Sequence, residues 1–132
     1  MWPCRNEGED ARLYSAVEAV SQYAIDLGIN IPTGKDSLSM AQKYSDKTVL
    51  APGTVIISAG GHCIDINNIV EPLLKNTDDE IYYIPQAKED FALGGSSFAQ
   101  TLNKIGTKIP QVLEGNEIIS IFNTVQKAIK GD

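Results

Sequence analysis

The stretch IPTGKDSLSM gathers residue types that could bind an anionic ligand. Gly34 would let the backbone approach a ligand closely, and Lys35 could place a point charge beside a phosphate. Asp36 could accept hydrogen bonds from hydroxyl groups or hold a cation. Ser37 and Ser39 would present two hydroxyl donors on the same side if the stretch were a strand. The alternative is a turn that enters a strand with a solvated Lys–Asp pair, and spacing alone favours this alternative.

This stretch does not fit the P-loop, which requires a glycine, four residues and then Gly-Lys followed by Ser or Thr. The nearest upstream glycine, Gly28, leaves five residues before Gly34, and Asp36 follows the lysine. A different role for these residues is therefore needed.

A second candidate is the stretch LGGSSF. Gly94, Gly95 and Ser96 at the start of a helix could leave backbone N–H groups free to bind an anion or phosphate. The alternative is a plain helix N-cap, made by Ser96 or Ser97 after a flexible turn. Capping explains these residue types without a ligand, so the residues alone favour it.

Helices are predicted on both sides of these candidates. Residues 9–27 carry an apolar stripe at helical spacing, with acidic residues in the first turn and Gly28 as a C-terminal cap. A glycine turn leads into a second helix, and a third amphipathic helix ends the sequence. The apolar residues of the three predicted helices are Leu13, Val17, Val20, Ala24 and Leu27; Phe98, Leu102 and Ile105; and Ile118, Phe122, Val125 and Ile129.

Short runs of apolar or alternating residues predict strands. The strongest is 54–57, which is nearly all apolar and therefore expected to be buried on both faces. Weaker strands are predicted at 29–32, 37–40 and 81–84, and a polar turn at 42–48. The order of elements indicates a mixed α/β chain with a boundary between residues 65 and 80, in which neither half covers its own sheet edges and helix faces.

Composition excludes several classes of protein. The chain has 132 residues and a formal net charge of −6, which disfavours nucleic acid and anionic membranes as partners. No apolar run approaches the length of a membrane span, and the N-terminus does not resemble a signal peptide. Cys4 and Cys63 lack metal-ligand spacing, and His62 is the only histidine, so we predict no metal site, no catalytic residue and a cytoplasmic location.

Four stretches, GEDARLYSAVEAV, IPTGKDSLSM, APGTVIISA and LGGSSFAQTLNKIG, occur in this order. Together they resemble the large, single-chain form of phosphoribosylformylglycinamidine synthase (FGAM synthase). The resemblance covers nearly the whole chain. Each stretch is weakly specific alone, but GKDSLSM and LGGSSFAQ are highly specific in combination.

The resemblance implies a fold of the α+β, aminoimidazole ribonucleotide synthetase-like type. Residues 1–66 would be the end of a synthetase N-terminal-type sheet domain, and residues 67–132 the start of a C-terminal-type domain, both from the second synthetase half. It also implies that Gly34, Lys35, Asp36, Ser37 and Ser39, with Gly94, Gly95 and Ser96, lie near a substrate or phosphate pocket.

The family is implied to be an ATP- and glutamine-dependent ligase with magnesium. It converts formylglycinamide ribonucleotide to formylglycinamidine ribonucleotide in de novo purine biosynthesis. The family's metal-binding residues would precede Trp2, and the glutaminase would lie elsewhere in the parent chain, so Cys4 and Cys63 are not given its catalytic role. The isolated chain is therefore expected to be inactive.

Two further interpretations stay open. The chain could be a non-catalytic structural or docking segment around a structural nucleotide, or, less in keeping with its uncovered edges, an independent regulatory domain. Whether the chain lines a pocket or is such a structural segment, its partners would be the remaining synthetase and glutaminase domains. The isolated chain is expected to associate with itself as a dimer, because its apolar stripes and strand edges lack cover.

Overall fold

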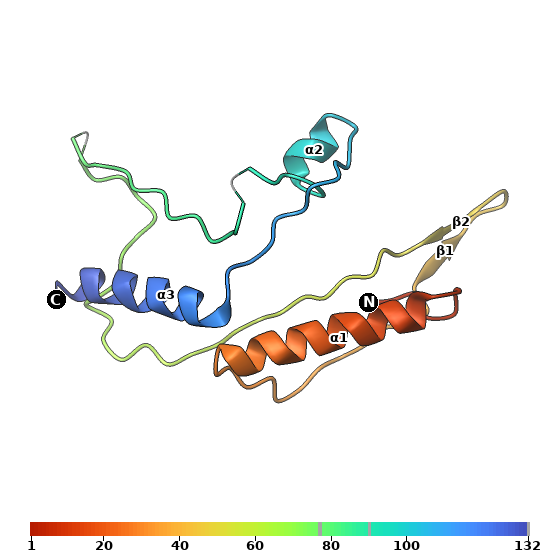
Figure 1. Cartoon of the computed structure of the whole chain (residues 1–132), viewed down its shortest axis with the longest axis horizontal. Coiled ribbons are helices and arrows are strands. Elements are labelled where there is room, and N and C mark those ends of the chain that lie inside the picture. Colours follow the sequence, from red (N-terminus) through yellow and green to blue (C-terminus); the bar gives the residue numbers. More distant parts are fainter. Residues whose placement is uncertain (77, 90, 132) are drawn as a thin grey trace. The chain divides into compact units, whose positions relative to one another are not determined.

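The computed structural model describes residues 1–76, 78–89 and 91–131. The chain divides into two units, Met1–Cys63 and Ile64–Asp132, and each is described by itself. The first unit holds one helix and a hairpin, and the second holds two helices (Figure 1). The elements are α1 (Glu9–Asp26), β1 (Ala41–Lys43), β2 (Thr48–Leu50), α2 (Ser97–Thr101) and α3 (Gly115–Lys130).

Helix α1 confirms the helix predicted from the first apolar stripe, including its glycine cap. Gly28 has a left-handed φ of 67°. Its N–H donates to the carbonyl of Ile25 at 3.0 Å, and the N–H of Ile29 donates to the carbonyl of Ala24 at 2.9 Å. These two bonds form a Schellman motif, which satisfies carbonyl groups that the end of a helix otherwise leaves unpaired.

The sheet of the first unit is a hairpin that lies where the sequence predicted a polar turn. Strands β1 and β2 pair antiparallel, with Ala41 opposite Leu50 and Lys43 opposite Thr48. The turn is shorter than predicted and is closed by a bond from the N–H of Tyr44 to the carbonyl of Lys47, 2.8 Å long. The prediction of a strand at 37–40 is wrong, because only Ser39 of that run forms a bridge, with Pro3.

The strands predicted at 29–32, 54–57 and 81–84 are not formed. A strand exists only where a neighbouring segment receives its backbone hydrogen bonds. Thr54 pairs with Met1, but no other inter-segment backbone bond is found along 54–57 in the described part of the chain. The expected burial on both faces is also wrong, since Ile56 is 75% exposed.

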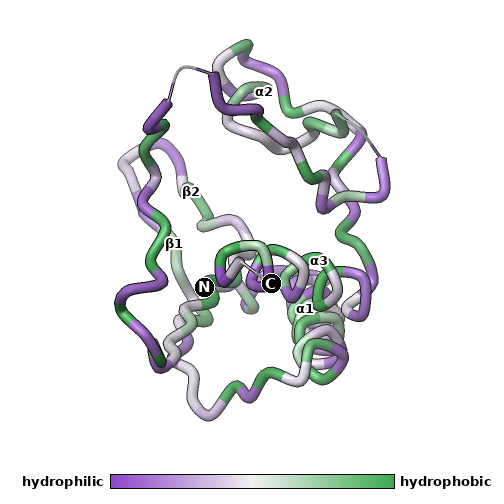
Figure 2. The backbone as a smooth tube through the Cα atoms, turned by 90° about the vertical axis from the view of Figure 1, so that its left-hand side faces the viewer, coloured by the Kyte–Doolittle hydropathy of each residue, from purple (hydrophilic) through white to green (hydrophobic). Residues whose placement is uncertain are grey.

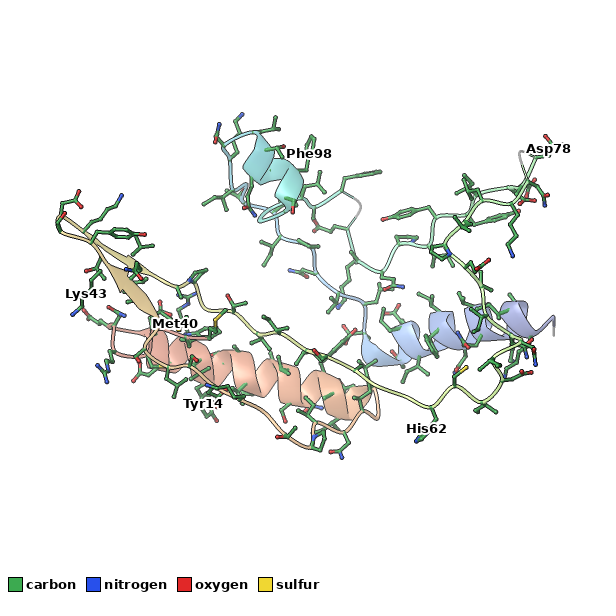
Figure 3. All side chains as sticks on the ribbon, turned by 180° about the vertical axis from the view of Figure 1, so that it is seen from behind. Tyr14, Met40, Lys43, His62, Asp78 and Phe98 are labelled. Carbon is green, nitrogen blue, oxygen red and sulfur yellow. The ribbon has the colours of Figure 1, made fainter. Side chains whose placement is uncertain are left out.

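In the second unit, α2 is shorter than the predicted helix. Asn103 has a left-handed φ of 54°, and the N–H of Lys104 bonds back to the carbonyl of Ala99 at 3.0 Å. The helix therefore ends before Leu102 and Ile105 can continue its apolar face. Phe98, which belongs to α2 and is labelled in Figure 3, is 61% exposed.

Helix α3 confirms the last predicted helix. Glu114 and Glu117 form a capping box at its start, and Gly131 follows its end in the left-handed conformation. Lys127 and Lys130 lie in the last turn, where positive charge suits the helix dipole.

Few apolar side chains are buried. Among the described residues the buried hydrophobic side chains are Trp2, Ala92 and Ala99. Hydrophobic stretches recur along the helices and the irregular segments in Figure 2. The observed mixture of helices with a two-stranded antiparallel sheet is compatible with an α+β class. None of the described helices is both long and apolar enough to cross a membrane.

Candidate functional site

A groove of about 540 Å³ lies in the first unit. One wall is the apolar stripe of α1, including Leu13, Val17, Val20 and Ala24. The segment that follows β2 runs back along α1 (Figure 1), and its residues 54–57 line the groove. A volume of this size lies within the range of small-molecule sites, which are mostly apolar with a few polar groups.

The first candidate stretch supplies the charged residues of this groove. Gly34, Lys35 and Asp36 all line it. The ammonium group of Lys35 donates a hydrogen bond to the backbone carbonyl of Asp36 and lies 3.4 Å from the hydroxyl oxygen of Ser37. Ser37 and Ser39 are not lining residues, so the structure brings three of the five predicted residues directly to the groove.

The N-terminal segment holds this stretch in place. The N–H of Trp2 donates to the carbonyl of Ser37 at 2.8 Å, and the N–H of Cys4 donates to the carbonyl of Leu38 at 3.1 Å. On its other side, Met1 exchanges hydrogen bonds of 2.8 and 2.9 Å with Thr54. The sequence analysis did not single out Trp2, although it is the chain's only tryptophan and is buried, with 6% of its surface exposed.

The second candidate stretch lies in the other unit. The N–H groups of Gly94 and Gly95 donate to the carbonyls of Lys108 and Ile105, at 2.6 and 2.7 Å. The hydroxyl oxygen of Ser96 accepts from the N–H of Ala99 at 3.1 Å, which is the N-cap alternative. These groups are paired within their own segment, so a phosphate would have to displace existing bonds. Their role in phosphate binding stays a prediction.

One lysine and one tyrosine have shifted pKa values, and both lie far in sequence from the groove-lining residues. The hydrogen bond from Lys88 to Glu114 raises the pKa of Lys88, and the charges of Glu114 and Glu117 add to this effect. The hydrogen bond that Tyr82 donates to Glu80 raises the pKa of Tyr82. Both side chains are exposed and hold local structure together.

Nothing in residues 1–76, 78–89 and 91–131 resembles a metal centre: no three acidic, histidine or cysteine side chains are grouped closely enough to hold an ion. His62, which Figure 3 labels, is exposed. Cys63 is exposed and Cys4 is half-buried. The groove can therefore offer a cation, a carboxylate and apolar walls to a ligand, but these side chains do not suit a magnesium ion.

Comparison with known proteins places this geometry in context. Residues 1–62 match the family described as FGAR-AT PurM_N-like domain. The chain is 36% identical over 132 residues to a probable phosphoribosylformylglycinamidine synthase of Caenorhabditis elegans. It is 39% identical over 131 residues to a probable phosphoribosylformylglycinamidine synthase, chloroplastic/mitochondrial, of Arabidopsis thaliana. It is 34% identical over 132 residues to the phosphoribosylformylglycinamidine synthase of Homo sapiens.

Each of these three alignments covers 98% of the chain but only 9–10% of the relative. The chain thus spans about a tenth of the length of the curated relatives that it matches. No solved structure matches the chain.

Proposed function

Because the chain belongs to the phosphoribosylformylglycinamidine synthase family, we propose that its Gly34–Ser37 stretch lines a substrate or phosphate pocket of such a ligase. The reaction would be the ATP- and glutamine-dependent conversion of formylglycinamide ribonucleotide to formylglycinamidine ribonucleotide. The observation that carries the proposal is that Gly34, Lys35 and Asp36 line the groove, within the residues that match the family.

The side chains of the groove suit a phosphorylated ligand with a less polar body. The ammonium group of Lys35 would pair with a phosphate, and the hydroxyl of Ser37 would donate to a second phosphate oxygen. Leu13, Val17 and Val20 would contact the remainder of the ligand. ATP would supply the activation of the substrate's amide oxygen. The described side chains of this chain do not fit a magnesium ion.

The rest of the pocket would come from the parent polypeptide. We propose residues 1–66 as the end of a synthetase N-terminal-type sheet domain and 67–132 as the start of a C-terminal-type domain, both of the second, aminoimidazole ribonucleotide synthetase-like half. The partners would be the remaining synthetase domains and the glutaminase. A cytoplasmic location stays a prediction.

A ligand titration followed by NMR tests this proposal. ATP and formylglycinamide ribonucleotide are added in turn to the ¹⁵N-labelled chain, with adenosine as the matched ligand that lacks phosphate. We expect saturable shifts of the Gly34–Ser39 amides with a phosphorylated ligand, and their loss in Lys35→Ala. Absence of any such shift in the wild-type chain would contradict the pocket.

A second candidate function is a structural or docking segment around a structural nucleotide, with no turnover of its own. Its supporting observation is that the Lys35 ammonium group already contacts the Asp36 carbonyl and the Ser37 hydroxyl. For this function, nucleotide would raise the melting temperature of a longer synthetase without being consumed. Kinetics that change on mutation of Lys35 would argue against it.

A further inference from the structure

We propose that Gly53 is a positioning residue for the Gly34–Ser37 stretch and that it acts through the indole ring of Trp2. The expected effect of Gly53 on ligand affinity rests on the proposed function. Its structural part, the coupling between Gly53 and Ser37, stands on contacts within the first unit. Neither Gly53 nor Trp2 belongs to the GKDSLSM signature; Trp2 itself lines the groove, whereas Gly53 does not.

The coupling begins with the backbone of Met1–Cys4. This segment lies between two others, since Trp2 and Cys4 donate hydrogen bonds to Ser37 and Leu38, while Met1 pairs with Thr54. Any shift of the segment is therefore passed to both neighbours. Ser37 is in turn the residue whose hydroxyl oxygen lies 3.4 Å from the Lys35 ammonium group.

Gly53 packs directly against the Trp2 ring. A Cβ atom at position 53 would lie 2.6–2.7 Å from three atoms of the indole. That separation is far below an ordinary carbon–carbon contact of about 3.5–4.0 Å. Gly53 is thus required for close approach and not for an unusual backbone conformation, because its φ is not positive.

The position of the ring depends on packing. Trp2 is 6% exposed, and its indole N–H has no hydrogen-bond partner among the described residues. The guanidinium group of Arg12 lies over the ring, 5.8 Å from its centre. No directional bond holds the indole, so a methyl group at position 53 would push it. The displaced ring would carry the Trp2 backbone away from the Ser37 carbonyl.

The test is a double-mutant cycle in the full 132-residue chain, with Gly53→Ala, Trp2→Leu and the double variant. Gly60→Ala is the matched control, because its added methyl group would meet no atom within 4 Å and its φ is not positive. The readouts are the amide shifts of Ser37–Ser39 without ligand, the fluorescence of the single tryptophan, and the affinity for inorganic phosphate.

We expect Gly53→Ala to move the Ser37–Ser39 amides, to shift the Trp2 emission to longer wavelength, and to weaken phosphate binding about tenfold. Gly60→Ala should do none of these. In the Trp2→Leu background, adding Gly53→Ala should change affinity by less than about twofold, because the clashing ring is gone. If Gly53→Ala alone fails to fold, the double variant should recover the helical circular dichroism signal.

Equal effects of Gly53→Ala in both backgrounds, or amide shifts no larger than those of Gly60→Ala, would overturn the inference. A double variant as unfolded as Gly53→Ala would do the same. A wild-type chain that does not respond to phosphate or to a phosphorylated ligand would instead contradict the proposed function, while the ligand-free amide shifts would still decide whether Gly53 positions Ser37.

Discussion

At the scale of single residues, the groove carries its charge on two neighbours, Lys35 and Asp36. Asp36 repels an approaching phosphate, so binding depends on how far the lysine charge exceeds this local opposition. A phosphate that accepts from both Lys35 and Ser37 would gain two charge-assisted bonds, which are stronger than bonds between neutral groups.

Lys35→Ala combined with Ser37→Ala should therefore impair substrate or nucleotide use in the family's full-length enzyme more than it impairs folding. Hydrogen bonds to charged groups are worth about 1.5–3 kcal/mol, which corresponds to a loss of roughly 10- to 150-fold in kcat/KM. Exposed lysines contribute little to stability, so the melting temperature should change little.

The matched control is Lys43→Ala with Ser45→Ala, which removes the same residue types at the same spacing. Lys43 is exposed, lies in β1, where Figure 3 labels it, and is not among the groove-lining residues. Its kinetics should equal those of the wild type. Unchanged kinetics and a lowered melting temperature in the Lys35 variant would support the structural role instead.

A second prediction at this scale concerns pH. Lys88 lies in a segment joined to residues 111–113, and its ion pair with Glu114 raises its pKa. An ion pair that raises a lysine pKa stabilises the folded state. This stabilisation is fully present below the ordinary lysine pKa of about 10.5 and is lost as the pH rises through the folded-state pKa. At about pH 9, Lys88→Gln should melt slightly below wild type, and this difference should close as the pH rises through the raised pKa of Lys88.

The control for this pair is Lys104→Gln, which removes a lysine without an ion pair in the described part of the chain. Its melting temperature relative to wild type should not depend on pH in this way. A difference for Lys88→Gln that persists at the higher pH would show that the ion pair is not its cause.

At the scale of secondary structure, the end of α1 offers a clear test. Gly28 adopts a left-handed conformation that costs other residues about 1–2 kcal/mol. Gly28→Ala should lower the free energy of unfolding by about 1 kcal/mol, and Gly28→Asn by less. Urea denaturation followed by circular dichroism measures both. A loss no larger than that of Gly60→Ala would mean that the Schellman motif is not maintained in solution.

The helices could be predicted because their signals lie within their own residues. The stripe of α1, its acidic first turn and Gly28 are all local, and so are the glutamates and lysines of α3. Strands differ, since their hydrogen-bond partners come from elsewhere in the chain. Val55 and Ile57 have strong strand preferences, but nothing among the described residues pairs with them. Conversely, β1 and β2 form because their turn closes locally.

The same distinction applies to the site. The residue types of Gly34–Asp36 allowed an anion site or a plain turn, and only the family resemblance favoured a pocket; in the structure these residues line a groove. The role of Trp2 could not be predicted, because its contact with Gly53 joins residues far apart in sequence. In LGGSSF, the residue types allowed either anion binding or capping, and only the bonds to Ile105 and Lys108 reveal that the N–H groups are already used.

At the scale of the whole molecule, exposed apolar side chains dominate. Along α1 no residue is fully buried, and Val17 and Ile25 are 57% and 68% exposed although both line the groove. On α3, Phe122 is 62% exposed. Each large apolar side chain left in water forgoes about 1.5–3 kcal/mol of burial energy. A few such side chains equal the whole stability expected of a small domain.

The isolated chain should therefore associate with itself at micromolar concentration, as a closed dimer. Pairing two copies along 54–57 would satisfy backbone groups that lack partners and would cover the stripe of α1 in one step. The net charge of −6 opposes larger aggregates without preventing a dimer. Val17→Glu should weaken the dimer about tenfold because it would bury a charge in the groove, whereas Tyr14→Glu, on the same helix but outside the groove, should not. Sedimentation equilibrium measures both, and a wild-type monomer with a sharp thermal transition would mean that the chain covers its own apolar surface and needs no partner to fold.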